Sequence, residues 1–84
     1  MPPFRIAWRD EGRDDVRRLD RATAMRLFEG IHHHAQTGAG NVAPLHGPLA
    51  GSFRLRLGDY RVMFTLENNT MGIFAVRNRR EAYR

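Results

Sequence analysis

Three arginines in one short stretch share a face of a predicted β-hairpin. Residues 51–61 read Gly-Ser-Phe-Arg-Leu-Arg-Leu-Gly-Asp-Tyr-Arg, so apolar and polar side chains alternate. Because neighbouring side chains of a strand point to opposite faces, Arg54 and Arg56 lie opposite the apolar set. Gly58-Asp59 marks a turn, and Arg61 joins the two arginines across the hairpin. Three guanidiniums with little acid nearby predict an anion site; the alternative is a solvated outer face.

The distribution of charge along the chain supports an anionic ligand. The net charge is +5, and all 14 basic residues are arginine. Residues 1–50 carry seven arginines and six acidic residues, whereas residues 51–84 carry seven arginines and three acidic residues. Arginine stays charged and binds phosphate through a planar fork. The basic excess in the second segment therefore favours a polyanion as the ligand.

Length and composition restrict the class of protein. Its 84 residues predict a single domain, residues 1–84, with a small core. The 42% hydrophobic content is typical of a globular chain. The sequence has no cysteine, which excludes disulfides and a thiolate metal site and fits a reducing compartment. No apolar run reaches the length of a membrane span, and the N-terminus lacks a signal-peptide core. We therefore expect a cytoplasmic protein without a membrane partner.

Hydrophobic periodicity predicts an α+β fold in the order strand, two helices, three strands. The strands are expected near residues 4–8, 53–57, 60–66 and 71–76, the helices at 10–19 and 21–35, and a loop at 36–48. Asp10 and Asp20 are the expected N-caps, and Asn68-Asn69 is the expected second hairpin turn. The prediction is an antiparallel sheet of about four strands with a two-helix hairpin packed on one face.

The same periodicity predicts the core and argues against a metal site. The expected buried residues are Leu27, Phe28, Ile31, Leu55, Leu57, Val62, Phe64 and Ile73. His32, His33 and His34 are consecutive near a helix end, and such neighbours do not share a helix face. They therefore do not form the ligand set of a metal ion, and we expect them to interact with the helix C-terminus when protonated.

Two segments resemble a known family. Residues 45–62, Leu-His-Gly-Pro-Leu-Ala-Gly-Ser-Phe-Arg-Leu-Arg-Leu-Gly-Asp-Tyr-Arg-Val, resemble the core signature of the RelE/ParE superfamily of type II toxin–antitoxin toxins. The ending at residues 76–84, Val-Arg-Asn-Arg-Arg-Glu-Ala-Tyr-Arg, does so too. The order and length of the elements match, so the resemblance covers nearly the whole chain. The Gly-Asp-Tyr-Arg-Val segment with the terminal Arg-Arg-Glu-x-Tyr-Arg is similar to the RelE-like branch.

This resemblance implies a toxin that cleaves mRNA in the ribosome and so inhibits translation. RelE-like toxins are endoribonucleases that need no metal or other cofactor, and a cognate antitoxin neutralises them in a hetero-oligomer. Matching the motifs gives the catalytic roles to Arg61, Arg79 and Tyr83. The expected RNA-binding residues are Arg54, Arg56, Arg77 and Arg80.

The chemistry of RNA cleavage is compatible with this set. The 2′-OH attacks the adjacent phosphate, which requires a proton acceptor, positive charge for the phosphorane and a proton donor for the leaving 5′-oxygen. Arginines supply the charge, usually the largest contribution. Tyr83 is the candidate acceptor, and its ordinary pKa of about 10 would have to be lowered by guanidiniums. Arginine is a weak acid, so orientation by the ribosome must compensate.

Two alternatives to the nuclease remain open at this point. Many relatives have His where this chain has Asn78, and Asn cannot transfer a proton in that way. A degenerate toxin that only binds is therefore one alternative. A ParE-like inhibitor of DNA gyrase without nuclease activity is the other, because the same fold serves both functions.

Overall fold

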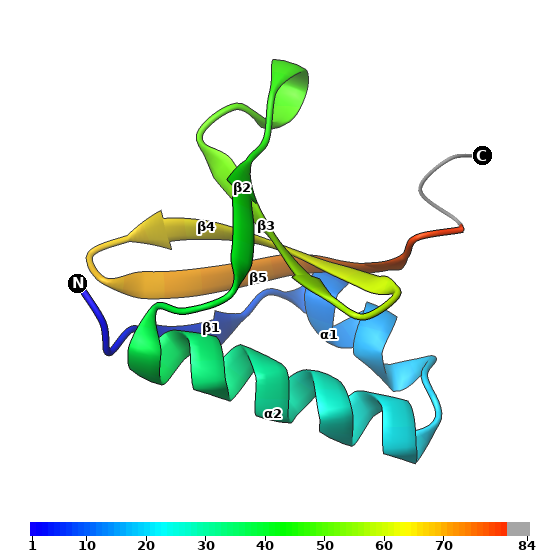
Figure 1. The fold of residues 1–84 in the computed structure, drawn as a ribbon. Helices are drawn as coiled ribbons and strands as arrows, with labels where there is room; N and C mark the ends of the chain where they lie inside the picture. The colour runs from blue at the N-terminus through cyan, green and yellow to red at the C-terminus, as the bar shows by residue number, and fades with distance from the viewer. Residues whose placement is uncertain (81–84) are drawn as a thin grey trace.

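A computed structural model of the protein describes residues 1–80 as one α+β unit (Figure 1). The elements, in chain order, are β1 (Arg5–Trp8), α1 (Asp10–Arg17), α2 (Arg21–Thr37), β2 (Asn41–Pro44), the 3₁₀ turn η1 (Gly47–Leu49), β3 (Ser52–Leu57), β4 (Tyr60–Glu67) and β5 (Thr70–Asn78). The strands form one sheet in the order β1-β5-β4-β3-β2. This arrangement confirms the α+β class and the strand–helix–helix beginning.

The sheet differs from the prediction in two pairings. β2 is a fifth strand within the segment predicted to be a loop, and it pairs antiparallel to β3. Its Gly- and Pro-rich surroundings obscured it, and Pro44 is tolerated because β2 is an edge strand. β1 pairs with β5 in parallel rather than antiparallel orientation, because the two helices carry the chain back across the sheet.

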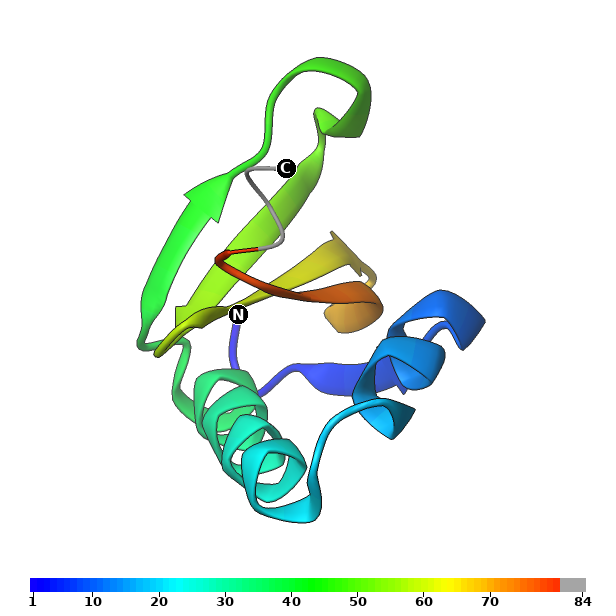
Figure 2. The same cartoon turned by 90° about the vertical axis from the view of Figure 1, so that its right-hand side faces the viewer.

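The core lies between α2 and the face of the sheet that we call the inner face (Figure 2). The largest fully buried side chains are Phe64, Ile31, Leu55, Met71, Ile73 and Val62. The prediction of a buried Phe28 was wrong, since this residue is 39% exposed. Phe28 lies at the rim of the apolar stripe of α2 and packs edge-on against Trp8, with 5.6 Å between ring centroids. Leu57 is only partly buried and contacts the helix at Gly30.

The two helices begin differently. Asp20 caps α2 as predicted, because its carboxylate accepts from the N–H of Thr23 at 3.1 Å and from the Thr23 hydroxyl at 2.6 Å. The predicted cap of α1 was wrong: Arg9 is the N-cap residue, and Asp10 is already helical. The N–H of Arg9 donates to the carbonyl of Ile73 at 2.8 Å, so a tertiary contact rather than a side-chain cap sets this helix end. Neither helix is long and apolar enough, within residues 1–80, to cross a membrane.

The hairpin turns use left-handed backbone where the sequence predicts it. Asn68 and Asn69 have φ angles of 50° and 60°, as a tight turn between β4 and β5 requires. Gly58 has a φ of 60° in the turn between β3 and β4. β2, η1 and the start of β3 form an arm that extends beyond the helices and the other strands (Figures 1 and 2).

Only one of the three consecutive histidines, His34, packs in the core. His34 is buried, and its ring lies 5.9 Å from that of Phe64. Its Nδ1 is 2.8 Å from the carbonyl oxygen of Ala39, so Nδ1 carries the proton and donates. His32 and His33 are exposed. In the described part of the chain, no three His, Asp or Glu side chains gather into a possible metal site.

Candidate nucleic-acid interface

Three arginines form a row across the sheet on the face opposite α2, which we call the outer face. Arg56 pairs with Arg61, and Arg61 pairs with Arg77. The adjacent positions Leu55 and Val62 are fully buried on the inner face, so the arginines point away from the helices. Like charges directly opposite one another destabilise a sheet. A row of three guanidiniums is therefore a place where an anion would stabilise the folded chain.

The two rows of outer-face residues beside the arginine row consist mostly of small side chains. One row further along the strands, the outer face carries Ala43, Arg54, Met63 and Ala75. The next row carries Ser52, Thr65, Gly72 and Ala7. Arg54, Arg56 and Arg61 are each partly buried on this face. The structure thus places Arg54, Arg56 and Arg61 on one face, as the sequence predicts, and pairs Arg77 with Arg61 in the same row.

Arg9 is a further outer-face arginine that the sequence analysis missed. A Cβ added to Gly72 would lie 3.1 Å from Nε and 3.3 Å from Nη2 of Arg9, and 2.6 Å from Oγ1 of Thr65. The guanidinium of Arg9 therefore lies over Gly72, beside Thr65 on the outer face. The signal was the alternation that runs from Arg5 and Ala7 in β1 to Arg9 directly after it, and only the parallel pairing of β1 with β5 places this set on the outer face.

Arg77 has a carboxylate partner on α1. Its Nη1 lies 2.7 Å from Oδ2 of Asp15 on α1. The same oxygen accepts from the backbone N–H of Val76 at 2.9 Å. The Asp15 side chain is only 9% exposed, whereas that of Arg77 is 46% exposed. Arg77 thus occupies one end of the arginine row, with its guanidinium directed toward α1.

The predicted C-terminal residues lie at one end of the row or beyond the described residues. The N–H of Arg79 donates to the carbonyl of Asp59 at 2.6 Å, which fixes Arg79 beside the β3–β4 turn. The N–H of Arg80 donates to Oδ1 of Asn78 at 2.9 Å, and Arg79 and Arg80 are both exposed. Tyr83 lies outside the described residues.

The described outer face supplies charge but little acid–base chemistry. Among residues 1–80, the strand positions of the arginine row and of the two rows beside it include no carboxylate, imidazole or phenol, and the carboxylate of Asp15 reaches Arg77 from α1. The acidic Glu67 lies in the row of Thr70 and Arg5, six residues from Arg61 and thus about 20 Å along the strand. The arrangement can hold an anion and stabilise added negative charge, and proton transfer requires a group from elsewhere.

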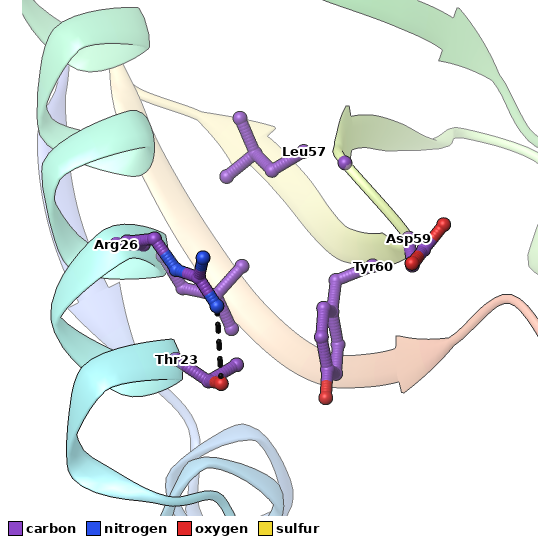
Figure 3. A pocket seen from close by; sticks show the side chains of 7 residues that line it. Thr23, Arg26, Leu57, Asp59 and Tyr60 are labelled. Atoms are coloured by element: carbon purple, nitrogen blue, oxygen red, sulfur yellow. Dashed lines mark hydrogen bonds between the residues drawn. The ribbon is translucent and has the colours of Figure 1, made fainter.

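A cavity of about 370 Å³ lies on the other side of the sheet (Figure 3). It separates the first turns of α2 from the β3–β4 turn, with Leu57 and Tyr60 across from Thr23 and Arg26. Nη2 of Arg26 donates to the Thr23 hydroxyl at 3.4 Å. Because Leu57 and Tyr60 are inner-face residues, this cavity is separate from the arginine face.

The chain matches the sequence model of a known protein family over nearly its whole length. The sequence model of the ParE toxin of the type II toxin–antitoxin system, parDE, matches residues 6–83. The chain therefore belongs to this family, within the RelE/ParE superfamily, and is the toxin of a type II toxin–antitoxin system. A search of curated proteins found no match.

Solved structures of toxins share the fold. The toxin–antitoxin complex RelBE2 from Mycobacterium tuberculosis contains a chain with a TM-score of 0.84 and 24% identity, and the match covers 94% of both chains. The RelE–RelB complex from the archaeon Pyrococcus horikoshii matches with a TM-score of 0.73 and 22% identity, covering 92% of this chain and 96% of the other. For the YoeB/ParE toxin from Agrobacterium tumefaciens the values are 0.72 and 19%, with coverage of 89% and 98%.

Proposed function

We propose that this toxin is a ribosome-dependent mRNA endoribonuclease that inhibits translation in the cytoplasm. The observation that carries the proposal is the cross-strand pair of Arg56 and Arg61 with Arg54 beside it on one sheet face. Such a face suits the phosphates of a single RNA strand, to which arginines bind by charge and by forked hydrogen bonds.

In the proposed reaction, the substrate supplies the nucleophile and the protein supplies charge. The 2′-OH attacks the adjacent phosphorus and loses its proton to Tyr83, while the bond to the 5′-oxygen breaks and that oxygen takes up a proton. The product strand ends in a 2′,3′-cyclic phosphate. Arg61 and Arg79 stabilise the phosphorane, and Arg54 and Arg56 hold neighbouring phosphates. The scheme needs no cofactor, and the ribosome supplies the orientation that a set weak in acid–base groups lacks.

A cognate antitoxin is the proposed regulatory partner. Membership of a toxin–antitoxin family supports this partner, and two of the matching folds come from complexes with antitoxins. We expect an acidic segment of the antitoxin to cover the arginine face in a hetero-oligomer. Antitoxin and RNA should then compete for the same guanidiniums, which a competition titration with labelled RNA measures.

Mapping of mRNA 5′ ends after tightly controlled expression tests the nuclease. We expect cuts within translated codons and in the reading frame, and none in untranslated RNA. Tyr83→Phe removes only the hydroxyl, so a large loss of cleavage with ribosome binding retained would identify Tyr83 as the proton acceptor. Cleavage by Tyr83→Phe at the parental rate would instead assign Tyr83 to stacking or packing.

Gyrase inhibition is the second candidate function, and the match to the ParE family favours it. A supercoiling assay with purified gyrase separates the two candidates. Inhibition of supercoiling without any cut in translated mRNA would replace the nuclease proposal. A chain that does neither, yet binds an antitoxin, would be a degenerate toxin.

A further inference from the structure

Helix α1 covers the part of the β5 edge that has no strand partner, and this contact determines the position of Arg77. β1 pairs only with Thr70 to Ile73 of β5, so the second half of that strand has no β1 partner. There the carboxylate of Asp15 accepts from the N–H of Val76, in the place of a strand carbonyl. Gly12 permits this approach, because a Cβ at that position would lie 2.6 Å from the carbonyl oxygen of Ile73.

Asp15 therefore both completes the sheet edge and neutralises Arg77. One oxygen, Oδ2, accepts from the backbone and lies 2.7 Å from the guanidinium. A nearly buried carboxylate that loses its cationic partner is left uncompensated, which is unfavourable. A phosphate that approaches the outer face must compete with Asp15 for Arg77, whereas the described residues around Arg54 and Arg56 contain no such carboxylate partner.

Arg9 lies on the outer face at a distance from the arginine row. Its guanidinium covers Gly72 beside the hydroxyl of Thr65. Thr65 is four residues along β4 from Arg61, which is about 13 Å. The Arg54 row lies between them, with Ala43 and Ala75 as its small members. The guanidiniums are thus arranged along the strand direction as well as across the strands.

We propose that the phosphate track of this face runs lengthwise, from Arg56 and Arg61 past Arg54 to Arg9, and that Asp15 excludes Arg77 from it. The ligand is the backbone of single-stranded RNA. This inference rests on the RNA binding proposed above and adds a direction, a new binding residue and a positioning residue. Four phosphate contacts to a single strand correspond to a slope near −3 for log affinity against log salt, at about −0.7 each.

The first test substitutes Arg9 and uses oligouridine as the probe. For Arg9→Gln, fluorescence anisotropy over a series of salt concentrations should give a slope less steep by about 0.7, because one phosphate contact is lost. Arg13→Gln is the matched control: it removes the same charge four residues away, from an exposed side chain 3.8 Å from Asp10. The control should leave the slope unchanged. An unchanged slope for Arg9→Gln, with the parent binding normally, would overturn the track to Arg9.

The second test releases Arg77. Asp15→Asn keeps an oxygen that can accept from Val76 but removes the charge, so Arg77 should become available and the slope should steepen by about 0.7. Asp14→Asn removes the same charge from an exposed neighbour that faces Arg17 at 3.7 Å, and it should not change the slope. Adding Arg77→Gln to Asp15→Asn should restore the parental slope. A purely structural Asp15 would change thermal stability but not the slope.

Arg77→Gln alone keeps the inference testable even if Asp15→Asn folds poorly. We expect this variant to bind with the parental slope and to unfold more easily, because Asp15 loses its partner. A slope reduced by about 0.7 would show that Arg77 is a phosphate ligand and would overturn the exclusion. If the parent binds no oligouridine at any salt, both the track and the proposed RNA function fail; if it binds but cuts no mRNA, only the nuclease fails.

Discussion

The two faces of the sheet are made by alternate residues of the same strands, yet they differ completely in character. On the inner face, Leu55 and Val62 are fully buried and Phe64 is 2% exposed. On the outer face, Arg54, Arg56 and Arg61 occupy the intervening positions. Because side chains alternate with period two, one strand can stabilise the fold with one set and bind a ligand with the other. Substitutions on the two faces should therefore separate stability from function.

The largest expected effect is on the inner face. Phe64 packs against the rings of Phe53 and His34, with centroids 5.7 and 5.9 Å away. Phe64→Ala should lower the free energy of unfolding by about 3–5 kcal/mol, as a large deletion in a core does. Urea unfolding measures this loss. Thr65→Ala, the next residue but on the outer face, is the control and should cost much less; equal losses would contradict the division between the faces.

Substitution of the arginines proposed to stabilise the phosphorane should strongly reduce cleavage and leave the fold intact. We expect Arg61→Ala or Arg79→Ala to lower the rate of mRNA cleavage on ribosomes by about 10²–10³, the usual effect of losing one electrostatic donor. Arg61→Lys keeps the charge but lacks the planar fork, so an intermediate rate is expected. Urea unfolding midpoints close to that of the parent would show that these variants remain folded. A variant that unfolds would show that Arg61 belongs to the structural set.

Substitution of the other strand arginines should affect binding more than chemistry. Arg54→Ala and Arg56→Ala should each make the salt dependence of oligouridine binding less steep by about 0.7. At saturating ribosomes their cleavage rates should stay near that of the parent, because these residues hold neighbouring phosphates. A salt-independent affinity of the parent would contradict phosphate contacts on this face altogether.

The smallest expected effect concerns the cap of α2, far from both sets. Hydrogen bonds from the hydroxyl and then the N–H of Thr23 hold the pKa of Asp20 below its ordinary value. Since the folded-state pKa is the lower one, the stabilisation is present above the ordinary aspartate range and is lost as the pH falls through the folded pKa. Asp20→Ala should therefore lower the melting temperature slightly at neutral pH. The difference from the parent should shrink on acidification for Asp20→Ala and for Asp20→Asn alike, because neither variant carries the carboxylate whose protonation weakens the parent's cap.

Local patterns in the sequence determined most of the elements and one face of the site. The alternation in residues 53–66 placed Leu55 and Val62 in the core and Arg54, Arg56 and Arg61 opposite them, because period two is a property of any strand. The Asp20 cap and the Asn68-Asn69 turn followed from side-chain and backbone preferences that act within a few residues. The family was recognisable from two short segments for the same reason: each is contiguous.

Only the tertiary structure decided the features that depend on pairing. β2 forms because β3 offers it a pairing partner. Arg9 rather than Asp10 is the N-cap of α1 because the carbonyl of Ile73 accepts the N–H of Arg9. Phe28 is exposed because it lies at the rim of the apolar stripe of α2. Asp15 meets Val76 across 61 positions of sequence. No local periodicity encodes such a contact, since it depends on how α1 packs against the edge of β5. The sequence determines where the arginines are, but the packing of the chain determines which group each guanidinium contacts.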